Sequence, residues 1–410
     1  MFFRLARKSL LDRKGSVILT LLAISVSIFV LLGIEHIRQQ AKENFSNTVS
    51  GTDLIVGART GNLNLLLYSV FRIGNAANNI RWETYQEIAS NPAVEWTIPI
   101  ALGDSHQGYR VMGTDAGYFD NFSYGAQRKL EFDEGLPFGS LFDVVIGSEV
   151  ARKLGYHLDD KLVLSHGLGS TSFSNHDDNP FRVSGILKGT GTPVDQTLHV
   201  SLEAIEAIHV GWQQGVKIPG APPSPEDLDI NELQPDSITA FMVGLKSRMT
   251  TFRLQREIND YPQEPLSAIL PGVTLTELWQ SLSTTENTLR LISLLVLTAS
   301  LLGLGALLLA SIRERQREIA VMRMLGASPW FIFLLIELEA VLITLLSAAL
   351  GAGVLFVTLV LSTDQIATKF GLHIDTNFLS QNNLLMLLLV FGCSLLVCLI
   401  PSISAYRKAH

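Results

Sequence analysis

The sequence predicts an integral membrane α-helical protein with four transmembrane helices and a large mixed α+β extracytoplasmic domain inserted between helices 1 and 2. A helix that crosses a bilayer needs about 20 apolar residues, and runs without Lys, Arg, Asp or Glu cover residues 16–34, 291–312, 340–363 and 376–406. The long segment between the first two runs mixes strand-like and helix-like patterns and is large enough for its own core.

The first element, residues 1–15, is predicted to be an amphipathic helix in the membrane interface. Its apolar side chains are set against five basic ones, and they are Phe2, Phe3, Leu5, Leu10 and Leu11. Residues 16–34 then form the first span. A secretory signal is the alternative, but the apolar run exceeds the roughly 7–15 residues of a signal core, and GIEHIRQQA offers no small-x-small cleavage site.

The extracytoplasmic domain is predicted over residues 35–288, with a polar helical stalk at each end. Strands are expected at DLIVGA, GYRVMGTD, FDVVIGSEV, FRVSGIL, TLHVSL and ITAFMVGLKS, and an amphipathic helix at TTFRLQREINDY. These segments alternate apolar and polar residues or end in turn residues. Residues 219–235 are acidic and Pro-rich, as is typical of a solvated loop.

This domain is acidic, because residues 35–286 hold 18 Lys and Arg against 31 Asp and Glu. That balance argues against nucleic acid as a partner and leaves peptides, lipids, cations or another protein open. Both cysteines, Cys393 and Cys398, fall in the last apolar run. No disulfide is therefore expected in the domain.

Three further spans are predicted at residues 289–312, 330–361 and 384–406. A connector at 313–329, an outer loop at 362–383 and a tail at 407–410 complete the chain. Because Lys and Arg beside spans stay in the cytoplasm, the basic connector and both basic ends predict a multi-pass protein with cytoplasmic termini.

The sequence contains no motif for catalysis. A P-loop needs Lys after its second Gly, and GILKGTGTP lacks it; H-E-x-x-H and G-x-S-x-G are also absent. A non-catalytic chain without a cofactor of its own is expected. No charged side chain or His lies in residues 291–312 or 384–406, where Ser and Thr supply most of the polar groups, so a hydrophilic solute is not expected to pass between the helices.

One loop and the strand that follows it contain residues that favour zinc. The weak metal candidates are His166, His176, Asp177, Asp178 and His199. Imidazole and carboxylate groups bind divalent metals, but the spacing has no ligand-like repeat. The alternative is a solvated loop whose polar side chains cap turns, and no metal site is assigned.

The connector resembles the signature of the FtsX/MacB-type (type VII) ABC transporter permeases, in which E-I-x-x-x-[RK]-x-[LM]-G-A-S precedes a helix containing Glu. VVIGSEVARKLGYHLDDKLVL and FRVSGILKGTGTPVD are similar to strands of that family's outer domain. The resemblance implies ATPase coupling through the connector and the helix after it. The residues concerned are Arg317, Glu318, Ile319, Arg323, Leu325, Gly326, Ala327, Ser328 and Glu337. For Glu337, pairing with connector arginines at the headgroup level is the alternative.

The resemblance also implies partners and a location. An ABC ATPase would bind in trans and carry ATP and Mg, and two permease copies would share the bacterial cytoplasmic (inner) membrane. Small residues at 303, 305, 351 and 353 would permit close helix contact in a homodimer, although a heterodimer with a related permease stays open.

Motion of the ATPase would reach the outer domain and move or extract a lipoprotein, lipid, peptide or drug-like substrate. The alternatives are an FtsX-like regulator that activates a cell-wall hydrolase and a complex for periplasmic zinc handling. A periplasmic or outer-membrane partner is left open, as is contact of the N-terminal helix with the ATPase instead of membrane lipid.

Overall fold

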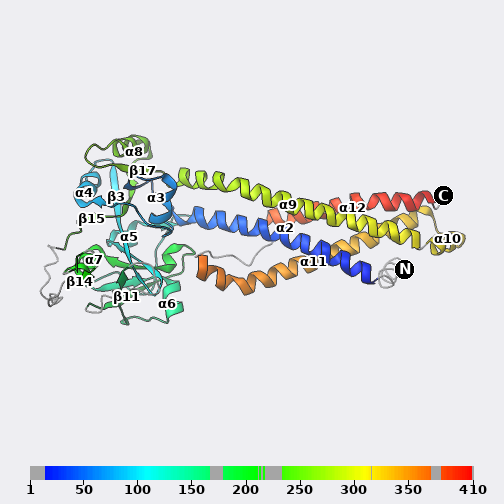
Figure 1. The fold of residues 1–410 in the computed structure, drawn as a ribbon, viewed down its shortest axis with the longest axis horizontal. Coiled ribbons are helices and arrows are strands. Elements are labelled where there is room, and N and C mark those ends of the chain that lie inside the picture. Colours follow the sequence, from blue (N-terminus) through cyan, green and yellow to red (C-terminus); the bar gives the residue numbers. More distant parts are fainter. Residues whose placement is uncertain are drawn as a thin grey trace. The chain divides into compact units, whose positions relative to one another are not determined.

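The computed structural model describes residues 14–166, 179–210, 212–213, 216–217, 233–314, 316–370 and 380–408. The chain divides into two compact units (Figure 1). The membrane unit comprises Met1–Ala41, Leu282–Lys369 and Ile374–His410, and the ectodomain unit comprises Lys42–Ser281 with Phe370–His373. Residues 167–178 and 218–232 lie outside the described residues. They hold most of the metal-candidate loop and most of the predicted loop at 219–235.

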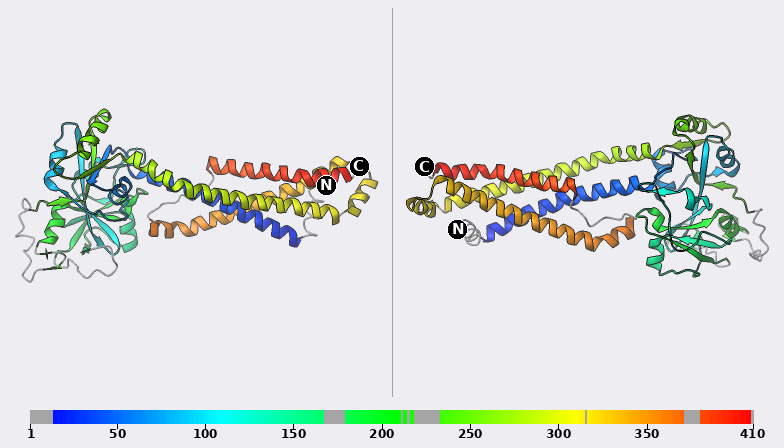
Figure 2. Two further views of the ribbon diagram at one scale, coloured as in Figure 1. Left: turned by 45° about the horizontal axis from the view of Figure 1, so that its top comes forward. Right: turned by 180° about the vertical axis from the view of Figure 1, so that it is seen from behind.

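Long helices build the membrane unit (Figure 2). Four are long and apolar enough to cross a membrane, as the sequence predicted. They are α2 (Lys14–Thr48), α9 (Pro271–Glu314), α11 (Pro329–Phe370) and α12 (Gln381–Lys408), and the short α10 (Gln316–Met324) lies between α9 and α11. The predicted stalks are continuations of α2 and α9, so no break separates either stalk from its span.

The spans pack through one apolar cluster to which all four contribute, including Ile28 of α2, Leu304 of α9, Ile336 of α11 and Cys398 of α12. Two of the four predicted small contact residues serve this packing. A Cβ on Gly351 would meet the carbonyl of Ser25 at 2.6 Å, and one on Gly305 would meet Val397 at 3.1 Å. Gly303 and Gly353 have open space around them.

The ectodomain is a mixed α+β domain built on one large sheet (Figure 1). Along its main path the strand order is β17, β1, β16, β3, β4, β12, β8, β11 and β7. Most neighbours are antiparallel, but β12 runs parallel to β4, and β11 runs parallel to β8. The strands are β1 (Leu54–Ala58), β3 (Val94–His106), β4 (Tyr109–Thr114), β7 (Phe132–Gly135), β8 (Asp143–Ile146), β11 (Phe181–Leu187), β12 (Thr197–Ser201), β16 (Ala240–Leu245) and β17 (Leu266–Ile269).

Every strand predicted from the sequence is present, but β3, the longest, was not predicted. It contains Pro99, and proline normally argues against a central strand because it donates no ladder hydrogen bond. Here the carbonyl of Pro99 accepts a bond from the Thr114 hydroxyl at 2.8 Å. The ladder with β4 also shifts register between Leu102 and Ser105. Neighbouring strands thus hold β3 where its own pattern is weak.

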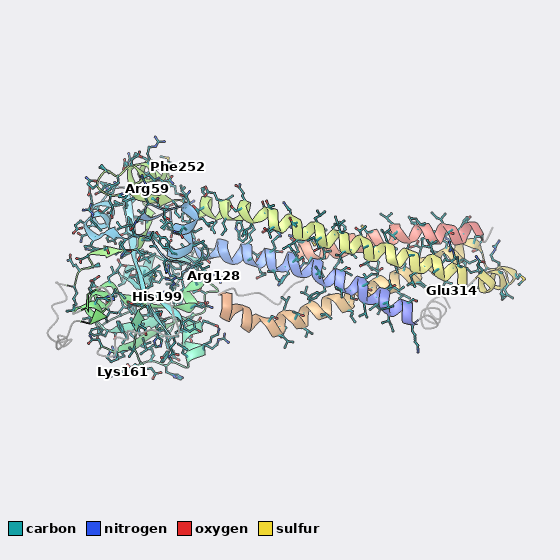
Figure 3. The ribbon with its side chains drawn as sticks, in the orientation of Figure 1. Arg59, Arg128, Lys161, His199, Phe252 and Glu314 are labelled. Atoms are coloured by element: carbon teal, nitrogen blue, oxygen red, sulfur yellow. The ribbon has the colours of Figure 1, made fainter. Side chains whose placement is uncertain are left out.

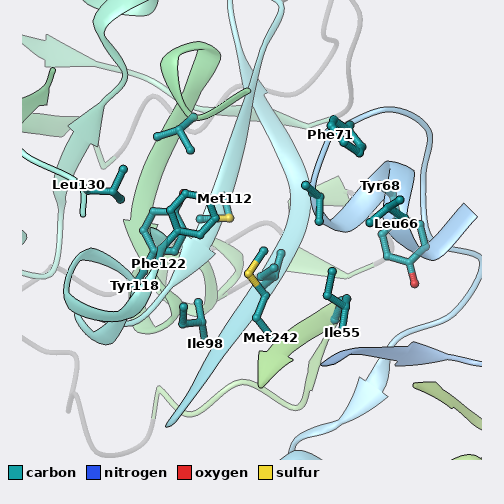
Figure 4. Close-up of a cluster of buried hydrophobic side chains, with 14 of the residues drawn as sticks. Ile55, Leu66, Tyr68, Phe71, Ile98, Met112, Tyr118, Phe122, Leu130 and Met242 are labelled. Carbon is teal, nitrogen blue, oxygen red and sulfur yellow. The ribbon is translucent and has the colours of Figure 1, made fainter. Parts of the chain in front are cut away.

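Short helices pack their apolar sides into three clusters. Leu66 of α3 (Asn62–Ser69) and Tyr118 of α5 (Gly117–Asn121) join the first cluster, in which Phe122 lies beside Met112 (Figure 4). The second cluster takes residues from α4 (Trp82–Ala89) and α8 (Thr251–Asn259). The third takes Val150 of α6 (Ser148–Leu154) and Ile208 of α7 (Leu202–His209). No disulfide joins the described parts of the ectodomain, so these clusters stabilise it.

The remaining elements are short. Strands β9 and β10 pair with β11 and β3, and three two-residue ladders lie apart from the main sheet. The short strands are β2 (Ile80–Arg81), β5 (Ser123–Tyr124), β6 (Arg128–Lys129), β9 (Lys161–Leu162), β10 (Ser165–His166), β13 (Trp212–Gln213), β14 (Val216–Lys217) and β15 (Ser237–Ile238), and the 3-10 turns are η1 (Pro193–Gln196) and η4 (Arg248–Thr250).

Candidate functional site

The connector ends α10 with a complete Schellman turn. The amide of Ala327 donates to the carbonyl of Met322 at 2.9 Å, and the amide of Gly326 donates to that of Arg323 at 3.0 Å. Gly326 has φ +91°, in the left-handed region that favours glycine. The guanidinium of Arg323 donates to the carbonyl of Ala327 at 3.2 Å. The turn therefore has a defined geometry.

The next helix begins directly after this turn. The hydroxyl of Ser328 accepts the amide of Phe331 at 3.2 Å, as an N-cap does. Pro329 occupies the first helical position, where its missing N–H costs nothing. Ser328 and Pro329 thus start α11.

The connector exposes apolar side chains. Met324 is 78% exposed and Leu325 is 83% exposed, and Val321 is exposed as well. We call these three residues the connector patch. They lie between the candidate spans that end at Glu314 and begin at Pro329.

The other predicted coupling residues differ in their surroundings. Ile319 packs partly against the apolar cluster of the bundle and so helps to hold α10. Its part in ATPase coupling stays a prediction. The side chains of Arg317 and Glu318 lie outside the described part of the structure. Glu314, at the end of α9, is exposed (Figure 3).

Glu337 faces a neighbouring helix and not the connector. Its Oε1 is buried, and the carboxylate lies near Ser402 of α12. No ion pair joins it to Arg313 or Arg323, the connector arginines whose side chains the structure describes. Pairing of Glu337 with the other connector arginines, Arg315 and Arg317, stays a prediction, because their side chains lie outside the described residues. Glu339 is buried in the bundle.

Sequence reasoning missed a charged cluster that joins α2 to α9. The carboxylate of Glu35 pairs with Arg38 of its own helix and with Arg290 of α9, where Nη2 lies 2.8 Å from Oε2. Glu286 lies 3.9 Å from Arg38. We call these four residues the stalk clasp. The available signal was that Glu35 directly follows one uncharged run and Arg290 directly precedes another.

The metal candidates do not form a site in the described residues. His176, Asp177 and Asp178 lie outside them, as does the side chain of His166. His199 is fully buried in β12 (Figure 3), and its ring stacks on Tyr118 with centroids 5.1 Å apart. Burial lowers the pKa of His199 to about 3, so the imidazole is neutral. In the described part of the chain, no three His, Cys, Asp or Glu side chains are grouped so that they could hold a metal ion.

Comparisons with known proteins match both units. The family model described as the MacB-like periplasmic core domain matches residues 17–261, and the one described as FtsX-like permease C-terminal matches residues 290–409. The extracellular domain of the noncanonic ABC-type transporter YknZ from Gram-positive bacteria is 13% identical, covers 53% of this chain and 99% of its own, and has a TM-score of 0.31.

The periplasmic region of MacB from Actinobacillus actinomycetemcomitans is 11% identical, with 56% of this chain and 94% of that chain covered and a TM-score of 0.36. No curated protein matches the chain. The two family models together span nearly all of the sequence, and the first alone covers more than half. The chain therefore belongs to the FtsX/MacB-type permease family.

Proposed function

We propose that the chain is the permease subunit of an ABC transporter whose ATPase is a separate protein that docks on the connector. The connector patch carries this proposal. Three apolar side chains are exposed there, outside the candidate spans, on a helix end that the Schellman turn holds in place. Exposed apolar clusters of this kind are typical of protein interaction sites.

The motion of the ATPase would pass along α9. This helix is continuous from Pro271 to Glu314, which corresponds to about 66 Å at 1.5 Å per residue. The stalk clasp ties α9 to α2, so both helices would move together. Work would then be done in the ectodomain on a lipoprotein, lipid, peptide or drug-like substrate.

The polar groups of the spans support transmission through the helices rather than a solute path. The hydroxyls of Ser27 and Ser300 lie 2.8 Å apart, and the hydroxyl of Ser347 donates to the carbonyl of Leu21 at 3.2 Å. These side chains satisfy one another inside the bundle. The basic connector and termini support a location in the inner membrane with both termini in the cytoplasm.

A second copy would complete the complex. Gly303 of α9 and Gly353 of α11 are exposed and have open space above them, while Gly305 and Gly351 already serve contacts within the chain. Small residues on a lipid-facing surface let a second helix approach closely. Nothing on the described residues favours a hydrolase-activating regulator or a zinc-handling complex over this function.

The docking proposal is tested by Met324→Ser combined with Leu325→Ser. A candidate ABC ATPase from the same organism would be co-expressed and co-purified with the chain. Loss of two exposed anchors should lower the amount of bound ATPase roughly tenfold or more. Met249→Ser, which alters an exposed methionine of the ectodomain, is the matched control and should retain the ATPase. Equal recovery in both variants would contradict docking at the connector patch.

A further inference from the structure

A second exposed surface lies on η4 and the following helix α8 of the ectodomain, far in sequence from the connector. Met249 is 92% exposed and Phe252 is 71% exposed. Arg248, Arg253 and Arg256 surround them in the sequence and are exposed as well. We call these five residues the α8 patch. Phe252 and Arg59 lie at the same end of the ectodomain (Figure 3).

The orientation of α8 is fixed by its inner side. Leu254 and Ile258 are buried in the apolar cluster shared with α4. The amide nitrogen of the Gln255 side chain donates to the carbonyl of Ala268 at 3.0 Å. At the end of the helix, the guanidinium of Arg59 donates to the carbonyl of Asn259 at 2.7 Å. The outward face is therefore presented rigidly, which lowers the entropic cost of binding.

The α8 patch is basic, whereas the domain around it is acidic. Residues 35–286 hold 31 acidic against 18 basic side chains. Arg253 lies 3.6 Å from Glu257 of the same helix. Arg248 and Arg256 have no ion-pair partner among the described residues. Two unpaired cations beside two exposed apolar side chains remain available for a ligand.

The same face is hollowed. A surface hollow of about 570 Å³ is lined by Phe252, Arg253, Arg256, Glu257 and Asp260. An apolar side chain fits over Phe252, and carboxylates fit beside the two arginines. Glu257 and Asp260 line the same hollow and would repel an extended anionic lipid surface, whereas a peptide has separate carboxylates that can contact the arginine guanidinium groups individually.

We propose that the α8 patch binds an acidic segment of a partner protein, with an aromatic or aliphatic anchor over Met249 and Phe252 and carboxylates on the arginines. Arginine and aromatic side chains are the residue types that most often dominate binding at protein interfaces. This surface is separate from the connector, so the inference goes beyond the proposed function and does not depend on ATPase docking.

The test uses the full chain in phosphatidylcholine nanodiscs and three fluorescein-labelled peptides. EDEFEDE carries the anchor and the carboxylates, EDEAEDE lacks the anchor, and KRKFKRK has the opposite charge. EDEFEDE should bind most tightly, as measured by fluorescence anisotropy, and its affinity should fall with added salt. A benzophenone in place of the phenylalanine should crosslink to α8.

Variants locate the site. Arg253→Glu combined with Arg256→Glu should raise the Kd for EDEFEDE roughly tenfold or more. The same variant should lower the Kd for KRKFKRK. Phe252→Ser should remove the difference between EDEFEDE and EDEAEDE. Arg128→Glu with Lys129→Glu, which reverses another exposed basic pair, should leave all affinities unchanged.

Three results would overturn the proposal. One is equal binding of the acidic peptides by wild type and by the double arginine variant. Another is flotation of the nanodisc-held chain with phosphatidylglycerol vesicles that depends on Phe252, which would assign the patch to lipid. The third is a loss of self-association in the arginine variant, which would assign it to a second copy of the chain.

Discussion

Oε2 of Glu35 on α2 lies 2.8 Å from Nη2 of Arg290 on α9. The carboxylate is 3% exposed, and Arg38 pairs with its other oxygen. The Nε of Arg38 also donates to Oε2 at 3.2 Å, so guanidinium groups from both helices meet on one carboxylate. A carboxylate with this arrangement joins two helices at one defined register.

Glu35→Gln should loosen this join. The amide keeps the shape but leaves Arg290 without this counter-charge and leaves Arg38 only Glu286, 3.9 Å away, at a cost of about 1–3 kcal/mol. Hydrogen exchange of the adjoining backbone of α2 and α9 should become faster, because local opening requires less free energy. Glu286→Gln is the matched control, since Glu286 reaches Arg38 only at 3.9 Å. Unchanged exchange in Glu35→Gln would show that apolar packing alone sets the register.

Gly326→Ala should weaken coupling to the ATPase. The cause would be the backbone conformation at this position and not a steric clash. Open space surrounds the α-carbon, but φ is +91°, and an L-residue pays roughly 1–2 kcal/mol there. The Schellman turn should open and the connector patch should lose its fixed position. ATPase recovery with the purified chain should fall about five- to tenfold. Gly272→Ala, at an open position with ordinary helical φ, should behave as wild type; a normal Gly326→Ala complex would argue against a rigid turn.

Gly147→Ala should destabilise the ectodomain by overpacking. A Cβ there would lie 2.3 Å from the carbonyl oxygen of Val194 and 2.4 Å from that of Asp195. These backbone atoms have little room to move, because the carboxylate of Asp195 holds the turn through the amides of Thr190 and Gly191. The free energy of unfolding should fall by about 1–3 kcal/mol. The apparent Tm should fall by roughly 2–4 °C for each kcal/mol lost. Gly103→Ala, with open space, is the control and should melt like wild type.

The sequence was informative wherever one physical signal dominated. Uncharged runs predicted the four spans, because a bilayer demands length and apolarity alone. The strands with regular alternation were also predicted.

Structural features that depend on contacts between residues far apart in the sequence could not be predicted. Pro99 obscured β3, which is held by β4 and β16 on either side. The stalk clasp needs α2 and α9 side by side, and they are far apart in the sequence. In the sequence His199 was a metal candidate. Its burial against Tyr118 depends on the fold, so the residues next to it in the sequence do not reveal it.

The ectodomain should lose stability as the pH falls, partly through His199. Burial lowers its pKa from 6.5 to about 3. Between these values the unfolded chain binds a proton that the folded chain does not, so the free energy of unfolding falls by up to roughly 1.4 kcal/mol per pH unit. Asp115 acts in the opposite direction, because burial raises its pKa from 3.8 to about 6 and the folded state binds the extra proton.

His199→Phe separates the two contributions. The phenyl ring can stack on Tyr118 but cannot take up a proton, so the apparent Tm of the full chain should change less between pH 7.5 and pH 5.0 than in wild type. The apparent Tm of Asp115→Asn should change more than that of wild type over the same pH range. This variant lacks the carboxyl group that binds a proton in the folded state below pH 6 and so opposes the effect of His199. His157→Phe alters a histidine that is 82% exposed and should follow wild type. If His199→Phe keeps the full wild-type decline, other groups must cause it.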